Sequence, residues 1–167
     1  MKTPQTLYFR DDGNIPNSGY PTLLYRGMTA ENGQSLVETL EALFEQNDWP
    51  AQWRGGVFDY HHFHSTAHEV LGVYDGAATL RLGGEQGENI EVSAGDVIVL
   101  PAGTGHCRIS ASNDFALTAG YPRGEGDWDI CRSGDNTPAV RQRIASVSRP
   151  SLDPVAGEAG GVASDWS

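Results

Sequence analysis

Closely spaced turns divide residues 53–121 into short runs of β-forming side chains, and this pattern constrains the fold more than any other. Residues 83–87 form a Gly-rich loop, and residues 94–96 predict a tight turn before the apolar run 97–100. Short strands at such close spacing are typical of a sandwich or a barrel. The 21 glycines and 9 prolines among the 167 residues agree with many turns and few long helices. The sequence therefore predicts an all-β fold.

The segment before this region has a different pattern, although the length fits one domain spanning residues 1–167. Residues 1–52 are expected to form an extension with one helix and a short strand at 22–25, ahead of a barrel core at 53–122. The helix is predicted because apolar side chains recur at helical spacing. They form one face, made of Leu36, Val37, Leu40, Leu43 and Phe44.

Residues 123–167 are predicted to form a mostly irregular C-terminal segment with one short helix. Thr137 is the expected cap of that helix, and Pro138 falls in its first turn. Beyond Ser148 the chain is rich in Gly, Ala, Ser and Pro. This composition fits either a segment that wraps the surface, with Trp166 as an anchor, or partial disorder.

The charge balance excludes several classes of partner. Lys and Arg number 11 against 22 Asp and Glu, which gives a formal net charge of −11. A nucleic-acid-binding protein needs a basic surface, and an anionic membrane would repel this chain. The two cysteines make no disulfide framework, and no apolar run reaches the roughly 18 residues of a membrane span. The N-terminus also lacks the pattern of a signal peptide, so we expect a cytoplasmic protein.

Four metal-ligating side chains occur at spacings that strands can bring to one point. On a strand, residues two apart share a side, so His62 and His64 face the same way. Glu69 is an odd number of positions from His64, so it joins them only if the chain bends at residues 65–67. His106 follows a loop and would arrive from a neighbouring strand. Three imidazoles and one carboxylate are similar to the two-His-one-carboxylate sites of non-haem iron proteins, with one histidine more.

The competing interpretation is that these histidines are ordinary surface or core residues. It is the better one for a single histidine, but four of the five histidines fall within residues 61–68. They cannot all be buried without partners, because burying an unpaired polar group is costly.

The spacing of glycine and proline around these residues resembles a known family. Residues 56–76 read G-x5-H-F-H-x4-E-x6-G, and residues 95–106 read G-x5-P-x-G-x2-H. Both are similar to the two motifs of the cupin superfamily, except that Ser110 stands where the second motif closes on asparagine. The resemblance covers residues 56–110 and is to small single-domain bacterial cupins.

The resemblance implies a jelly-roll β-barrel, a class of fold that includes cupins. It implies one divalent transition metal ion, either Fe, Mn, Ni, Zn, Co or Cu, held by His62, His64, Glu69 and His106. It also implies a homodimer. The loss of the motif's asparagine puts little about the metal in doubt, because that residue is usually structural.

The resemblance leaves three functions open. The first is a metal-dependent enzyme acting on a small molecule, as a dioxygenase, decarboxylase or isomerase. The alternative is a non-catalytic cupin that binds a small ligand or a metal, and the third is a structural cupin with a vestigial site. His68 is the candidate catalytic residue, as a general base. Two other roles stay open for it: a hydrogen-bond partner of a metal ligand, or an alternative metal ligand. Arg81 and Arg108 fit either an anionic substrate or the solvated surface.

Overall fold

The computed structural model describes residues 3–167 and contains two antiparallel β-sheets whose apolar faces share one core. The first sheet has the strand order β1 (Gln5–Leu7), β2 (Thr22–Tyr25), β8 (Val97–Leu100), β5 (Glu69–Asp75), β10 (Ala116–Gly120) and β3 (Ala51–Gly55). The second has the order β11 (Cys131–Arg132), β4 (His62–Phe63), β9 (His106–Ala111), β6 (Ala77–Leu82) and β7 (Glu88–Ser93). The predicted all-β jelly roll is confirmed.

Strands that are neighbours in a sheet are often distant in the sequence. β5 lies between β8 and β10, and β9 lies between β4 and β6. Alternate residues of β5, such as Leu71 and Val73, point into the core between the sheets, which also contains Leu80 and Leu82 of β6. These pairings bring the two predicted motif regions together, because β4 and β9 are adjacent in the second sheet.

The strand β2 joins the segment before residue 53 to the first sheet. All four residues of this strand are buried, and β2 pairs with β8 inside the first sheet. Leu24 faces the core between the sheets, whereas Leu23 and Tyr25 face a second apolar cluster on the other side. The segment before residue 53 thus completes the sheet, because both faces of β2 are needed to cover apolar surface.

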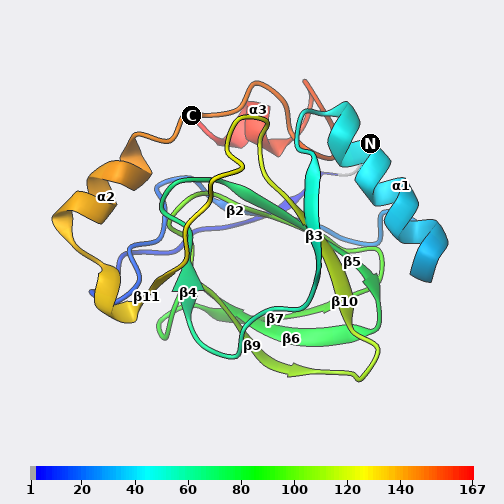
Figure 1. The fold of residues 1–167 in the computed structure, drawn as a ribbon, viewed down its shortest axis with the longest axis horizontal. Helices are drawn as coiled ribbons and strands as arrows, with labels where there is room; N and C mark the ends of the chain where they lie inside the picture. The colour runs from blue at the N-terminus through cyan, green and yellow to red at the C-terminus, as the bar shows by residue number, and fades with distance from the viewer. Residues whose placement is uncertain (1–2) are drawn as a thin grey trace.

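The predicted N-terminal helix, α1 (Gly33–Gln46), covers the outer side of the first sheet, as Figure 1 shows. Its buried residues are Leu36, Val37, Leu40 and Phe44, which pack with Val70 of β5. Gly72 of β5 allows this close approach. A Cβ at Gly72 would lie 3.0 Å from side-chain carbons of both Leu40 and Phe44, so a larger residue would push the helix away.

The C-terminal segment contains more helix than the sequence predicted. The expected helix, α2 (Pro138–Ala145), begins where Thr137 Oγ1 accepts a hydrogen bond from the Val140 N–H at 3.2 Å. A 3₁₀ helix, η1 (Ser133–Asp135), and a short helix, α3 (Gly161–Asp165), were not predicted.

The final residues wrap over the first sheet and are anchored by Trp166. This side chain is fully buried, and its indole N–H donates to the Pro21 carbonyl at 2.9 Å. The Tyr25 hydroxyl donates to the Asp153 carboxylate at 2.8 Å and ties the same segment to β2. Figure 1 shows α1 and α2 at opposite sides of the strands, with α3 between them. Within residues 3–167, no helix combines the length and the apolar character that a membrane span requires.

Candidate metal centre

The structure brings together all four side chains predicted to bind a metal. His62 in β4 and His106 at the start of β9 are direct partners across the second sheet, and His64 lies just beyond β4. One ligand atom from each of these histidines lies within 4.8 Å of the other two, and all three side chains are buried. Glu69 comes from β5 in the opposite sheet, and its Oε1 lies 3.3 Å from Nε2 of both His64 and His106. The cluster therefore sits between the two sheets.

The bend that returns Glu69 to the side of the histidines occurs at Ser65 and Thr66, within the predicted range. The carboxylate of Asp129 holds it. Asp129 Oδ1 accepts from the Ser65 N–H at 2.7 Å and from the Thr66 hydroxyl at 3.2 Å, and the Ser65 hydroxyl donates to the other oxygen. Asp129 lies in the irregular segment after β10, so no periodic pattern marked it.

Each histidine of the cluster has its Nδ1 beside a backbone carbonyl. The distances are 3.1 Å from His62 to Tyr60 O and 3.1 Å from His106 to Thr104 O, and His64 contacts Asp129 O. A carbonyl can only accept, so each Nδ1 carries the proton. In the neutral form of each ring the unprotonated nitrogen is therefore Nε2, and this is the tautomer that ligates a metal through Nε2.

The carboxylate of Glu69 is buried and has one oxygen without a hydrogen bond. The Tyr121 hydroxyl donates to Oε2 at 2.6 Å, whereas Oε1 has no hydrogen-bond partner among residues 3–167. An unsatisfied buried carboxylate oxygen is costly, and a cation between Oε1 and the imidazoles would satisfy it. The four donors therefore fit a transition metal ion, because imidazole nitrogen and carboxylate oxygen suit several of them.

Burial and mutual contact shift the pKa values of Glu69, His62 and His64. Burial alone would raise the pKa of Glu69, but the adjacent His64 and His106 hold it well below its usual value, so the carboxylate is charged. Burial and the neighbouring His106 lower the pKa of His62 to about 3, which keeps that ring neutral near pH 7. Burial would also lower the pKa of His64, but the negative charge of Glu69 outweighs it and raises that pKa.

A cavity of about 290 Å³ opens onto the cluster. Its walls are Trp53, Gly56, Val57, Phe58, Leu71 and Trp128, together with His62, His64, Glu69 and His106. Trp128 stacks on Tyr121 at 5.2 Å between ring centroids and meets His64 edge to face at 5.3 Å. Trp128 and Asp129 lie in the irregular segment after β10, and their part in the site becomes visible only in three dimensions.

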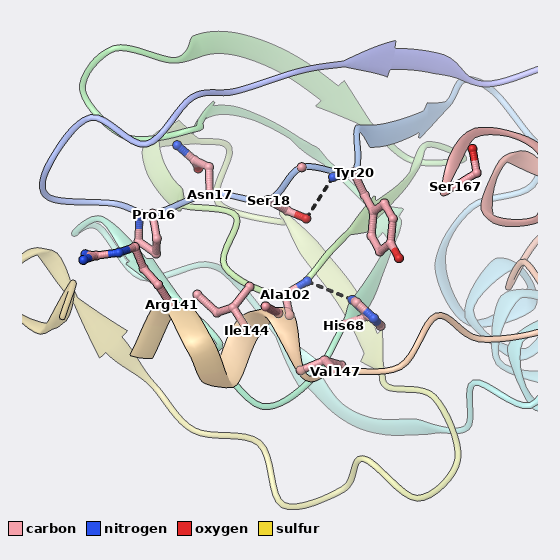
Figure 2. Close-up of a pocket in the computed structure, with 12 residues that line it drawn as sticks. Pro16, Asn17, Ser18, Tyr20, His68, Ala102, Arg141, Ile144, Val147 and Ser167 are labelled. Atoms are coloured by element: carbon pink, nitrogen blue, oxygen red, sulfur yellow. Dashed lines mark hydrogen bonds between the residues drawn. The ribbon is translucent and has the colours of Figure 1, made fainter. Parts of the chain in front are cut away.

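His68, the candidate catalytic residue, lies apart from the cluster. As the residue before Glu69 it faces away from it, and it lines a second cavity of about 420 Å³. Figure 2 shows His68 in this cavity, between the loop at Pro16–Tyr20 and α2. Its Nδ1 accepts from the Ala102 N–H at 2.9 Å, and its Nε2 lies 3.0 Å from Ser148 O. Both nitrogens are thus occupied by backbone groups, and the geometry gives His68 no part in chemistry at the cluster.

Arg81 and Arg108 are also outside the cavity that contains the four predicted ligands. Arg81 donates to Asn89 Oδ1 at 2.8 Å and to Glu85 O at 2.7 Å. Arg108 lies 3.9 Å from Asp59. Both arginines therefore interact with surface groups.

The sequence and the geometry together define a cupin. Residues 53–118 match the family model described as a cupin domain. Over 156 residues the chain is 36% identical to the uncharacterized protein YjlB of Bacillus subtilis (strain 168), covering 92% of this chain and 91% of that protein. The chain therefore belongs to the cupin superfamily.

Two solved structures show a more distant likeness. An acireductone dioxygenase from Bacillus anthracis, with a cadmium ion in its active centre, is 16% identical, with a TM-score of 0.33. That match covers 65% of this chain and 53% of the dioxygenase. RmlC from Streptococcus suis, in complex with dTDP-D-xylose, is 14% identical, with a TM-score of 0.35, over 73% of this chain and 72% of RmlC. Similarities this low carry no argument about activity.

Proposed function

We propose that this protein is a metal-dependent enzyme acting on a small molecule, with His62, His64, Glu69 and His106 as the ligands of one divalent transition metal ion. One observation supports this proposal above all. Three imidazole nitrogens and a carboxylate oxygen that lacks a hydrogen bond converge at the wall of a cavity. A purely structural cluster would need neither the unsatisfied oxygen nor the adjoining space.

The protein's own residues would prepare the ligands and shape the space beside them. Backbone carbonyls hold the imidazoles in one tautomer. The Tyr121 hydroxyl donates a hydrogen bond to Oε2 of Glu69, and the other oxygen, Oε1, then faces the histidines. The apolar wall restricts water near the cluster, which strengthens electrostatic interactions there. A metal ion held by this set would supply Lewis-acid chemistry, or dioxygen chemistry in the case of iron.

The candidate reaction types are dioxygenation, decarboxylation and isomerisation. Among the residues described, the cavity is lined by no titratable side chain besides the four proposed ligands. A proton acceptor in the reaction would then have to be a ligand of the metal or the substrate itself. The non-catalytic alternative shares the same metal site, so the first experiment must establish the metal.

Elemental analysis of protein purified without chelator tests the proposal. We expect a stoichiometric transition metal ion, followed by oxygen consumption or product formation in a screen of small molecules. Protein that contains no metal, and whose melting temperature does not respond to added Mn, Fe, Co, Ni, Cu or Zn, would contradict it. Metal without turnover of any compound would favour the binding alternative. The homodimer and the cytoplasmic location stay predictions, and light scattering after size exclusion tests the first.

A further inference from the structure

The wall of the cavity beside the proposed metal site is apolar and aromatic. Apart from the four proposed ligands, it is formed by Trp53, Gly56, Val57, Phe58, Leu71 and Trp128. Among the described residues this wall includes no Lys or Arg and no hydroxyl or amide side chain. Apart from the proposed ligands, the only side-chain donors that residues 3–167 place in this wall are the indole N–H groups of Trp53 and Trp128, so a substrate meets mostly hydrocarbon and aromatic surface.

Three polar side chains at or near this wall, those of Trp53, Tyr121 and Asp129, already have hydrogen-bond partners. The Trp53 indole N–H donates to the Tyr121 hydroxyl at 2.8 Å, and that hydroxyl donates to Glu69. Asp129 is engaged by Ser65 and Thr66. These groups are therefore engaged within the protein, and the polar partners left for a substrate are the metal and the neutral indole N–H of Trp128.

The charge of the site sets a limit on the charge of the substrate. A divalent ion with three neutral imidazoles and one carboxylate has a net charge of about +1, so it can balance a single anionic head group. A second carboxylate or a phosphate would be buried against apolar walls without a cation, which is costly.

One arginine lies near enough to offer a rival interpretation. Arg132 is the cross-strand partner of His62, and its guanidinium stacks on the Tyr60 ring at 3.7 Å from the centroid. Tyr60 in turn meets His62 edge to face at 5.7 Å. Arg132 does not line the cavity, and the aromatic ring already covers one face of its guanidinium.

From these observations we propose the substrate class: a small, mainly apolar molecule, such as a single aromatic ring, that binds the metal through one oxygen-bearing head and carries no second charged group. This inference rests on the proposed metal site and adds to it. The cavity of about 290 Å³ lies at the small end of the roughly 300–1,000 Å³ typical of ligand sites. Trp53, Phe58 and Trp128 supply the flat surfaces that an aromatic ring would contact.

Two matched probes test this proposal, catechol and 3,4-dihydroxybenzoate. They share the same metal-binding oxygens and differ by one carboxylate. Binding is measured by isothermal titration calorimetry on the full chain loaded with Zn²⁺, which has no redox chemistry and therefore reports binding alone. Zinc content is measured before and after each titration, so that removal of the metal by a probe is detected.

We expect catechol to bind and 3,4-dihydroxybenzoate to bind at least about tenfold more weakly, the equivalent of roughly 1.4 kcal/mol. Trp128→Ala should weaken catechol binding about tenfold, because an aromatic contact and its buried area are lost. Tyr8→Ala is the matched control, since Tyr8 is 68% exposed and lies outside the cavity, and it should leave catechol binding unchanged.

Three results would overturn the proposal. Equal or tighter binding of 3,4-dihydroxybenzoate, abolished by Arg132→Met, would show that Arg132 receives a substrate carboxylate. A stoichiometric zinc complex that binds no catechol would reject the substrate class and leave the metal site standing. Failure to take up zinc or any other transition metal would reject both the substrate class and the proposed function.

Discussion

The hydroxyl of Tyr121 donates a hydrogen bond of 2.6 Å to Oε2 of Glu69, and this contact leaves the other carboxylate oxygen facing the three histidines. Tyr121 directly follows β10 and Glu69 begins β5, and these two strands are adjacent and antiparallel. The phenol thereby fixes the rotation of the carboxylate. Burial and the charge of Glu69 raise the pKa of Tyr121, so the hydroxyl remains protonated and continues to donate.

We predict that Tyr121→Phe weakens metal binding about 10- to 100-fold, as removing a partner that orients a ligand does elsewhere. Oε2 of Glu69 would be left buried without a donor, and the carboxylate would be free to rotate. The measurement is competition with a fluorescent chelator. Tyr74→Phe is the control, because Tyr74 packs in the cluster beneath α1. Equal affinity in wild type and Tyr121→Phe would contradict a positioning role for the phenol.

Replacing His62 should abolish metal-dependent stabilisation. In wild type, a metal at about 100 times its dissociation constant should stabilise the fold by roughly 2.7 kcal/mol. We expect His62→Ala to lose this effect in a thermal melt with added metal. His61→Ala is the control, because His61 instead lies 2.8 Å from Glu85 on the surface. If both variants respond to metal as wild type does, His62 is not a ligand.

We predict that His68 contributes to the stability of the fold and not to metal affinity. His68→Ala would leave the Ala102 N–H and the Ser148 carbonyl without their partner, and we expect a loss of about 3 kcal/mol in the free energy of unfolding. His68→Gln, which can accept from one group and donate to the other, should restore part of it. Denaturant unfolding and metal titration of both variants check this. A large loss of metal affinity with unchanged stability would return His68 to the candidate active site.

The ionisation of Glu125 should lower the free energy of unfolding as the pH rises. Its Oε1 accepts from the His68 N–H at 2.9 Å, and burial raises the pKa of its carboxyl to about 7 despite that hydrogen bond. The folded state therefore holds the proton more tightly than the unfolded state, and this contribution is lost as the pH rises from about 4.5 through 7.

Glu125→Gln retains an acceptor and removes this ionisation. The free energy of unfolding of the variant minus that of wild type should increase by about 1 kcal/mol from pH 5 to pH 8. This is less than the full pKa shift would give, because the side chain is only half buried and solvent screens its charge. Unfolding curves across this range provide the measurement, with the exposed Glu88→Gln as control. A difference that does not change with pH would show that Glu125 is already ionised at pH 5.

Several elements could be predicted because their signals are local. Apolar spacing predicted α1, and Thr137 with Pro138 predicted the start of α2. A common side for His62 and His64 followed from strand parity alone. The bend before Glu69 was expected at the right place, but only as a condition for Glu69 to join the histidines. The bend is held by Asp129, which lies more than sixty residues away in the sequence.

The sequence by itself therefore determined an all-β cupin with four candidate ligands at defined spacings. Only the tertiary structure decided that Glu69 approaches the histidines with one free oxygen, that Tyr121 orients it, and that His68 turns away to bond the backbone. It also placed β2 inside the sheet. The physical reason is that periodicity describes which way one segment faces, whereas contacts between distant strands are chosen by the burial and hydrogen bonding of the whole chain.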